Sequence, residues 1–215
     1  MKRFLVVISL IFPLLSFASD NLTYKEILQD YKQSYFYEKI GDYKDAIRVL
    51  MPIYKAYPYG YTINLRLGWL YYLWGKYENS KFHYRRAISA IPSSVEAKLG
   101  LSLPLMAQER WKDVEMLMYQ IIATDYYNYY ANLRLCSALE HQKKYSMELY
   151  IARKMLAIYP TSVPFLVFLG KSYYHLGNLK AAYETFRNVL ILDPENNTAK
   201  DFLKKIEEKL NKKQK

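Results

Sequence analysis

The chain has 215 residues, of which 52% are hydrophobic and 17% aromatic, and its formal net charge is +11. This is enough apolar material for one ordinary domain, or for an array of small units that share a continuous core. With only 7 Gly, 8 Pro and no long alternating run of Val, Ile and Thr, the composition favours an all-α fold, and a single Cys excludes an intramolecular disulfide.

The segment 1–18 has the pattern of a signal peptide. Lys2 and Arg3 precede the apolar run 4–15, and small residues follow at Ser16 and Ala18. A run of this length is short for a membrane span, which needs about 20 residues. We therefore expect cleavage after Ala18 and, for a bacterial source, a periplasmic or secreted protein with no transmembrane helix in the mature chain. An uncleaved membrane anchor is the alternative.

The positive charge bears on the kind of partner. Loss of the leader would lower the net charge from +11 to +9, because only two cations leave with it. Such an excess favours anionic partners. An acidic protein face, anionic lipid or an acidic polysaccharide suits an exported chain better than nucleic acid does, and a merely solvated basic surface is the alternative.

After a short lead-in, 19–26, one sequence pattern recurs along the chain with a constant period. The period equals the distance in sequence from Pro58 to Pro92. Thr23 and Glu26 form a capping box that predicts the start of the first helix. The column that closes each unit contains Pro58, Pro92, Tyr126, Pro160 and Pro194. A column of small residues contains Ser34, Gly68, Ser102, Cys136 and Gly170. Small residues let two helices of a hairpin approach closely, and the closing Pro ends the second helix.

This pattern resembles the tetratricopeptide repeat family. The resemblance rests in one copy on Leu67, Gly68, Tyr71, Gly75, Tyr77, Ala87 and Pro92, and in another on Leu169, Gly170, Tyr173, Gly177, Ala182, Phe186 and Pro194. It implies an all-α, right-handed α-solenoid of five helix-turn-helix units. The units would be 27–60, 61–94, 95–128, 129–162 and 163–196, followed by a capping helix and basic tail in 197–215.

Local signals refine the units. Ser93 and Glu96 predict a capping box ahead of the third unit, and Pro164 suits the first turn of a helix. Pro104 falls inside the first helix of the third unit, where a proline costs roughly 3 kcal/mol. It predicts either a local kink that the neighbours absorb or a hinge between two halves. A last helix from Thr198 to about Leu210 has one apolar face.

No catalytic pattern is present. The sequence contains no Gly-rich phosphate loop, no H-E-x-x-H, no paired Cys and no G-x-S-x-G motif. We therefore expect neither enzyme activity nor a cofactor. Cys136 occupies the small-residue column and is interpreted as a buried structural residue. His141 and His175 occupy equivalent places on adjacent units and His83 stands alone, so a zinc site of three or four ligands is not expected.

The resemblance also implies where a partner would bind. In tetratricopeptide arrays first helices line the concave groove, and three first-helix columns should face it here. From them we expect partner contacts at Lys32, Tyr35, Arg66, Trp69, Tyr72, Arg134, Lys171 and Tyr174. Aromatic residues give large contact area, and Arg captures carboxylates. The alternative for each Tyr is a plain packing role.

The favoured function is a non-enzymatic adaptor of the cell envelope that binds a protein or peptide in this groove, and the positive net charge favours an acidic one. The alternative is a scaffold associated with exopolysaccharide export, in contact with an acidic polysaccharide. RNA binding is disfavoured by the leader and by the repeat pattern. The sequence itself names no partner.

Overall fold

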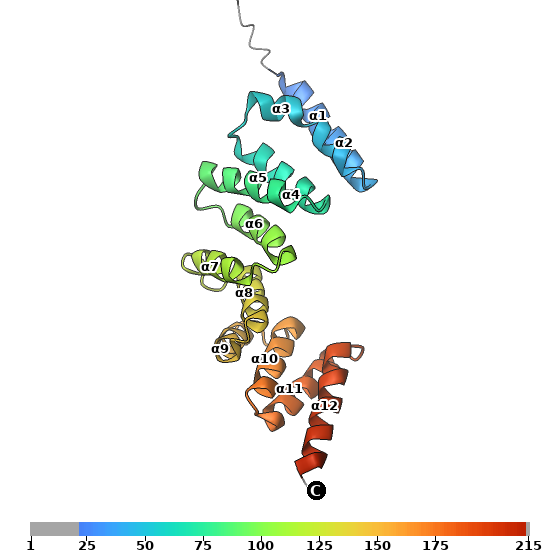
Figure 1. Cartoon of the computed structure of the whole chain (residues 1–215), viewed down its shortest axis with the longest axis vertical. Helices are drawn as coiled ribbons and strands as arrows, with labels where there is room; N and C mark the ends of the chain where they lie inside the picture. The colour runs from blue at the N-terminus through green and yellow to red at the C-terminus, as the bar shows by residue number, and fades with distance from the viewer. Residues whose placement is uncertain (1–21, 214–215) are drawn as a thin grey trace, which may run out of the picture.

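The computed structural model describes residues 22–213, so the predicted signal peptide lies outside the described residues. Within this range every regular element is a helix (Figure 1). The helices are α1 (Tyr24–Lys39), α2 (Tyr43–Arg48), α3 (Met51–Ala56), α4 (Tyr61–Leu73), α5 (Tyr77–Ala90), α6 (Val95–Ala107), α7 (Trp111–Ile122), α8 (Tyr129–His141), α9 (Tyr145–Leu156), α10 (Val163–His175), α11 (Leu179–Leu192) and α12 (Asn197–Lys213).

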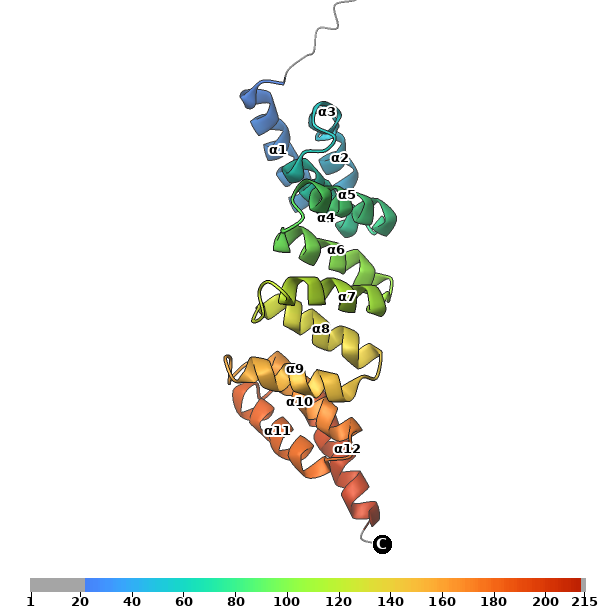
Figure 2. The ribbon, with the colours of Figure 1, turned by 90° about the vertical axis from the view of Figure 1, so that its left-hand side faces the viewer.

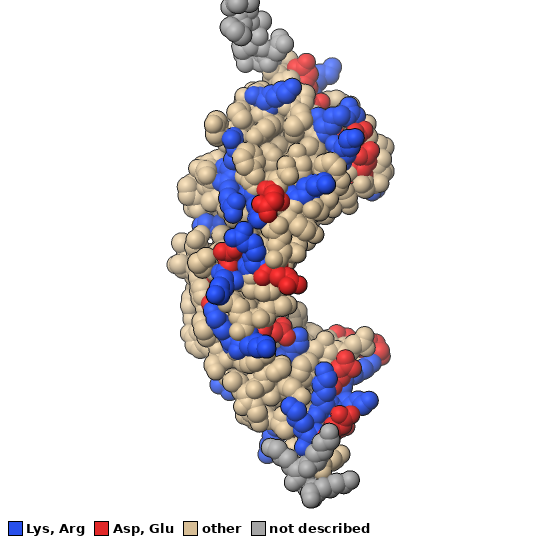
Figure 3. All heavy atoms as spheres, in the orientation of Figure 1, with Lys and Arg blue, Asp and Glu red and all other residues tan. Residues whose placement is uncertain are grey.

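The helices form consecutive hairpins that stack along one axis (Figure 2). The first helices of the hairpins are α1, α4, α6, α8 and α10, and α12 packs against the last hairpin. In space-filling view the stack is a crescent with a hollow inner side (Figure 3). The predicted all-α solenoid of five helix-turn-helix units with a capping helix is confirmed.

The first unit departs from a simple hairpin. Its second helix is divided into α2, which ends at Arg48, and α3, which begins at Met51. Pro52 lies in the first turn of α3. Its nitrogen has no hydrogen to donate to the carbonyl of Arg48, four residues back, and its ring clashes with that carbonyl. The break therefore follows from a proline inside what would otherwise be one helix.

The turns within the hairpins require a left-handed residue. Gly41, Gly75 and Gly177 have φ of 80°, 73° and 82°, as their place after the first helix predicts. The other two units lack this glycine, and Glu109 and Lys143 take the same position with φ of 54° and 58°. A side chain in this conformation is strained, because its Cβ approaches the backbone.

The small-residue column allows close packing, as predicted. A Cβ on Gly68 would lie 2.9 Å from the ring of Tyr84, and a Cβ on Gly170 would lie 2.7 Å from that of Phe186. Cys136 in the same column is fully buried, and burial raises the pKa of its thiol. The thiol is therefore protonated and inert at neutral pH.

Pro104 lies within α6, which continues past it to Ala107. It is buried, and the residues around it, Leu101 and Leu105, belong to the largest core cluster, which extends from Tyr84 to Phe165. A second cluster covers the first two units, and a third joins α10, α11 and α12. A hinge at Pro104 stays a prediction, although the borders between clusters lie elsewhere.

Of the two predicted capping boxes, the structure confirms the one ahead of α1 and contradicts the one ahead of α6. Thr23 and Glu26 form the reciprocal capping box ahead of α1. Ahead of α6, however, the cap is Ser94, whose hydroxyl accepts a hydrogen bond from the backbone N–H of Ala97, so the predicted box on Ser93 is wrong. Ser94 is the last extended residue before the helix, and its N–H closes the preceding turn on the carbonyl of Ile91.

The start of α10 agrees with the prediction, and the capping helix α12 is present but extends further than predicted. Pro164 lies in the first turn of α10, where its missing N–H is no loss. The capping helix is longer than expected, from Asn197 to Lys213, and Phe202 and Ile206 pack on the last hairpin. Among the described residues, none of the helices combines the length and apolar character that crossing a membrane requires.

Candidate functional site

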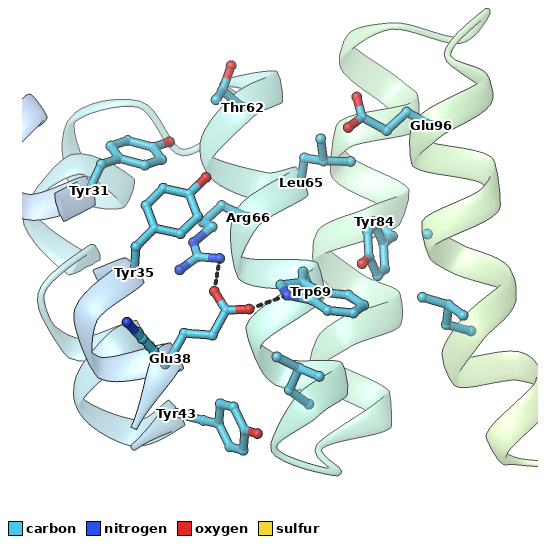
Figure 4. Close-up of a pocket in the computed structure, with 14 residues that line it drawn as sticks. Tyr31, Tyr35, Glu38, Tyr43, Thr62, Leu65, Arg66, Trp69, Tyr84 and Glu96 are labelled. Carbon is cyan, nitrogen blue, oxygen red and sulfur yellow. Dashed lines mark hydrogen bonds and ion pairs between the residues drawn. The ribbon is translucent and has the colours of Figure 1, made fainter. Parts of the chain in front are cut away.

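A hollow of about 830 Å³ opens on the inner surface between α1, α4 and α6 (Figure 4). First helices supply most of its wall, and Tyr43 of α2 and Tyr84 of α5 complete it. Its larger lining side chains are Tyr31, Tyr35, Leu65, Trp69, Tyr84 and Leu103. The predicted groove therefore contains a concavity at its N-terminal end, where Tyr35 and Trp69 lie.

Glu38 ties the floor of this hollow together. Its carboxylate forms an ion pair with Arg66 and accepts a hydrogen bond of 2.7 Å from Nε1 of Trp69 (Figure 4). Arg66 Nη2 also donates to Oγ of Ser34 at 3.1 Å, and its guanidinium lies 3.9 Å from the centroid of the Tyr35 ring. Three predicted site residues, Tyr35, Arg66 and Trp69, are thus brought together by one that was not predicted.

The hydrogen bonds and the ion pair of this network compensate the buried charge of Arg66. Only 7% of Arg66 is exposed, and a charge removed from water needs a partner with good geometry. Glu38 supplies that partner from the preceding unit, so α1 and α4 are joined by a charge-assisted contact. Arg66 is therefore part of the floor and not a free cation in the groove. It lies against the Tyr35 ring, and its partner Glu38 holds the indole of Trp69.

Tyr84 forms the far wall of the hollow. Its ring lies between two glycines on neighbouring first helices, and a Cβ on Gly100 would come within 2.2 Å of it. Gly100 belongs to the same column as Arg66, but here the position is filled by the tyrosine ring instead of a side chain of its own. Burial raises the pKa of Tyr84, so the phenol stays neutral.

The contact between α6 and α8 repeats the α1–α4 contact with one difference. Arg134 lies two units after Arg66, and it donates to Oγ of Ser102 at 2.5 Å just as Arg66 donates to Ser34. A second hydrogen bond goes to the carbonyl of Leu99, also from Nη1. The position of Glu38 is occupied by Met106, so none of the ion pairs of the described residues includes Arg134.

Partial burial has a cost for Arg134. Its pKa is lowered by burial, and the phenols of Tyr84, Tyr72 and Tyr130 only partly counter this. The charged guanidinium is thus less well compensated than that of Arg66. It can accept a carboxylate from outside, because both hydrogen bonds that it makes use the same terminal nitrogen.

The remaining predicted residues lie apart from the hollow. Lys32 is exposed on α1, and the ring of Tyr72 is 5.7 Å from that of Trp69. Lys171 forms an ion pair of 2.9 Å with Glu140. Tyr174 is covered by α12, where its ring meets Phe202 edge-on at 5.0 Å and lies 4.0 Å from Nζ of Lys209.

A longer repeat could have revealed the α1–α4 contact. Residues 61–68 read YTINLRLG and residues 129–136 read YYANLRLC, so units two and four share a motif that the others lack. The shared tyrosines also act alike, because Tyr61 bonds Ser94 at 2.8 Å and Tyr129 bonds Ser162 at 2.9 Å. A period of two units therefore underlies the period of one unit.

Glu148 is a second buried ionisable side chain without a hydrogen-bond partner among the described residues. It is fully buried in α9, and both of its oxygens lack a hydrogen-bond partner among the described residues. The other units have smaller uncharged residues at this position, which are Ala46, Ser80, Val114 and Ala182. Burial, and then the carboxylate of Glu140, raises the pKa of Glu148 to about 8. The nearby hydroxyl of Ser172 opposes this rise only weakly, because it is not placed as a well-formed hydrogen bond. At neutral pH most of Glu148 is protonated.

The histidines have packing roles. His141 stacks on Trp111 at 3.8 Å and His175 stacks on Tyr145 at 4.2 Å, and each partner is the first residue of the second helix in the preceding unit. His83 Nδ1 is 2.9 Å from Oδ1 of Asn64, and burial lowers its pKa to about 4. Within residues 22–213 no group of three or more His, Cys, Asp and Glu is placed to hold a metal ion.

Comparisons with known proteins agree with this geometry. Residues 61–94 and 163–196 match the model of the family described as tetratricopeptide repeat. No curated protein matches the chain in sequence.

Solved structures are similar in fold. MamA (residues 41 to the end) from Desulfovibrio magneticus RS-1 has 15% identity and a TM-score of 0.72, covering 80% of this chain and 97% of that one. A second MamA crystal structure has 18% identity and a TM-score of 0.70, covering 80% and 93%. YrrB, described as a TPR protein with an unusual peptide-binding site, has 14% identity and a TM-score of 0.68, covering 82% and 91%.

At these identities the likeness concerns the fold. Together with the two matched repeats, it agrees with the stacked hairpins and with the glycine columns that let them approach. The chain is a solenoid of the tetratricopeptide type, two of whose units match the family model.

Proposed function

We propose that this protein is a non-enzymatic scaffold of the cell envelope that holds an extended segment of a protein partner in its concave groove. The observation that carries the proposal is the aromatic hollow between α1, α4 and α6, whose floor is fixed by Glu38. A preorganised aromatic surface loses little conformational entropy when a peptide is bound. YrrB, which has a similar fold, is described by its peptide-binding site, and this supports a peptide as the class of ligand.

The same proposal extends to an acidic partner. Arg134 has the hydrogen bond to serine that Arg66 has, but it lacks the carboxylate. A peptide that lies along the first helices from Tyr35 past Leu103 would bring a carboxylate to Arg134. A bidentate pair of this kind is the strong form of carboxylate recognition.

The location in the envelope rests on the sequence. The pattern in 1–18 supports export and cleavage near Ala18, which would make the mature protein periplasmic or secreted. Localisation is tested by a fusion of the full chain to alkaline phosphatase, which is active only after export. An inactive fusion that is nevertheless expressed would contradict this part of the proposal.

The groove is tested by photocrosslinking in living cells. Benzoylphenylalanine replaces Leu103, which lines the hollow, or Tyr24, which is exposed on α1 outside it. We expect a protein adduct from position 103 that is absent from position 24. The adduct should weaken when R134Q is added. Equal adducts from both positions would contradict the groove assignment.

An acidic polysaccharide is the competing ligand. The purified protein is applied to a glycan array and to a peptide array at physiological salt. Binding to peptides with glutamate, and not to the same peptides with glutamine, is the expected result. Binding confined to anionic glycans would replace the protein partner by a polysaccharide.

A further inference from the structure

A second hollow lies on the outer side of the solenoid, between α7 and α9. Its volume is about 590 Å³, and its lining includes Tyr119, Ile122, Tyr126, Met147, Tyr150 and Lys154. All of these belong to second helices or to the loop after α7. In Figure 1, α7 and α9 lie on the outer, left-hand side of the crescent, away from its hollow side.

Three of the side chains that line it, Tyr119, Tyr126 and Met147, depart from the repeat. The column of Tyr119 contains Met51, Arg85, Arg153 and Arg187 in the other units, and that of Met147 contains Asp45, Asn79, Asp113 and Ala181. Tyr126 stands where the other four units have their closing proline. At the positions of Tyr119 and Met147, large side chains thus replace residues that are charged, polar or small in every other unit except for Met51, and at the position of Tyr126 an aromatic ring replaces proline. Packing of the solenoid does not require them, because the other units pack without them.

These apolar side chains are accessible. Met147 is 42% exposed and Tyr150 is 60% exposed. The hydroxyls of Tyr126 and Tyr150 are 3.2 Å apart, so the loop after α7 and helix α9 meet at the rim. Exposed apolar surface that is hollowed in this way is typical of an interaction site.

Lys154 gives the hollow a charge. Its Nζ donates to the carbonyl of Tyr126 at 3.1 Å and lies 4.0 Å from the centroid of the same ring. None of the ion pairs formed by the described residues includes it. An apolar cavity that contains an uncompensated cation is complementary to an apolar side chain next to a carboxylate.

We propose that this outer hollow is a second docking site, which takes a protein segment carrying a large apolar side chain beside an Asp or Glu. A second copy of this chain is a poorer occupant, because the chain is basic even after loss of the leader, which lowers its net charge from +11 to +9, and would bring more cations toward Lys154. The two hollows lie on opposite faces, so both can be filled at once. The protein would then bridge two partners.

The test uses a peptide array and two methionine variants. The array carries short peptides, each with one Phe, Leu or Trp beside Asp or Glu, and a matched set with Asn or Gln instead. M147D installs the residue that two other units have at this position. M116D is the control, since Met116 is 59% exposed on α7 and does not line the hollow.

We expect a set of acidic peptides whose Kd rises at least tenfold with M147D and less than twofold with M116D. K154Q should remove the preference of this set for acidic over amide peptides. The groove variant Y35A should leave the set unchanged, which separates this site from the groove. Circular dichroism confirms that each variant is folded.

Three results would overturn the proposal. One is an array in which no acidic peptide responds to M147D more than to M116D. Another is loss of the same peptides with Y35A, which would place them in the concave groove. The third is a dimer in analytical ultracentrifugation that dissociates with M147D, because a second copy would then be the occupant.

Discussion

The two halves of the solenoid treat buried charge differently. In the N-terminal half, Arg66 is compensated by Glu38 of the preceding unit, and the aromatic floor of the hollow is built on that pair. In the C-terminal half, Arg134 has no carboxylate partner and Glu148 has no hydrogen-bond partner among the described residues. Units with the same backbone fold can therefore differ in how their buried ionisable side chains are stabilised. In the first half the buried cation has a carboxylate partner, although Nε of Arg66 itself has none among the described residues. In the second half neither Arg134 nor Glu148 has an oppositely charged group bonded to it, so their ionisation depends on solvent or ligand.

The largest expected effect concerns Glu148 and pH. Its pKa is about 8 in the folded chain against 4.5 as the usual value, so the folded state keeps a proton that the unfolded state loses. Stability therefore falls as pH rises from about 4.5 to 8, by roughly 5 kcal/mol in total. E148A, which installs the residue of units one and five, should remove this fall.

Thermal unfolding between pH 4.5 and about 8 measures the effect. S80A is the control, because Ser80 occupies the same column but does not titrate in this range. An unchanged pH dependence in E148A would show that the comparison of the two halves is wrong at this residue.

The next largest effect concerns the ion pair between Glu38 and Arg66 in the N-terminal half. E38A leaves Arg66 buried without its carboxylate, which should destabilise the protein by about 3 kcal/mol. M106A, at the equivalent place in the third unit, removes only apolar contact. Urea unfolding compares the two variants, and a cost for E38A no greater than that for M106A would mean that the ion pair contributes nothing.

A smaller effect is expected when Arg134, in the C-terminal half, is given a carboxylate partner. M106E places a carboxylate where Glu38 stands relative to its arginine, and it should stabilise the protein by about 1 kcal/mol. The gain should disappear in M106E with R134Q, as a double-mutant cycle would show. M106E should also weaken partners that reach Arg134, whereas M106Q should not. A gain that persists without Arg134 would contradict the comparison of the two contacts.

The smallest effect concerns the turns. E109G and K143G place glycine at the two left-handed positions that now have a side chain, and each should stabilise the protein by about 0.5 kcal/mol. G41A should do the reverse, although no atom lies within 4 Å of the added Cβ, because the φ of 80° is the only obstacle. Chemical denaturation resolves these differences if the three variants are measured together.

The sequence predicted the solenoid because every unit repeats the same packing requirement. Columns such as that of Gly68 and Gly170 are set by helix contacts that recur in every unit, and the structure confirms them. The break at Pro52 was not predicted, since the column pattern continues through it. The choice between Ser93 and Ser94 as a cap depended on a turn hydrogen bond that spacing alone does not indicate.

The site was predicted less completely. A column says which face a residue occupies, and so it placed Tyr35 and Trp69 near one another. It does not say which side chain on one helix meets which on the next, and so Glu38 was not recognised as the centre of the hollow. Tyr84 was also missed, because only first helices were expected to line the groove, whereas Tyr84 lies on the second helix α5 and fills the space left by Gly100.

The two-unit period also has a consequence for how such a chain can change in length. Removal of units two and three, 61–128, would place α8 directly after the first unit, with Arg134 at the position that Arg66 now occupies relative to Ser34 and Glu38. A shorter protein made in this way would keep a matched junction. Removal of unit two alone, 61–94, would set α6, which has Gly100 in place of the arginine, against Glu38. The pair of units, and not the single hairpin, is therefore the segment that can be gained or lost without creating an unmatched charge.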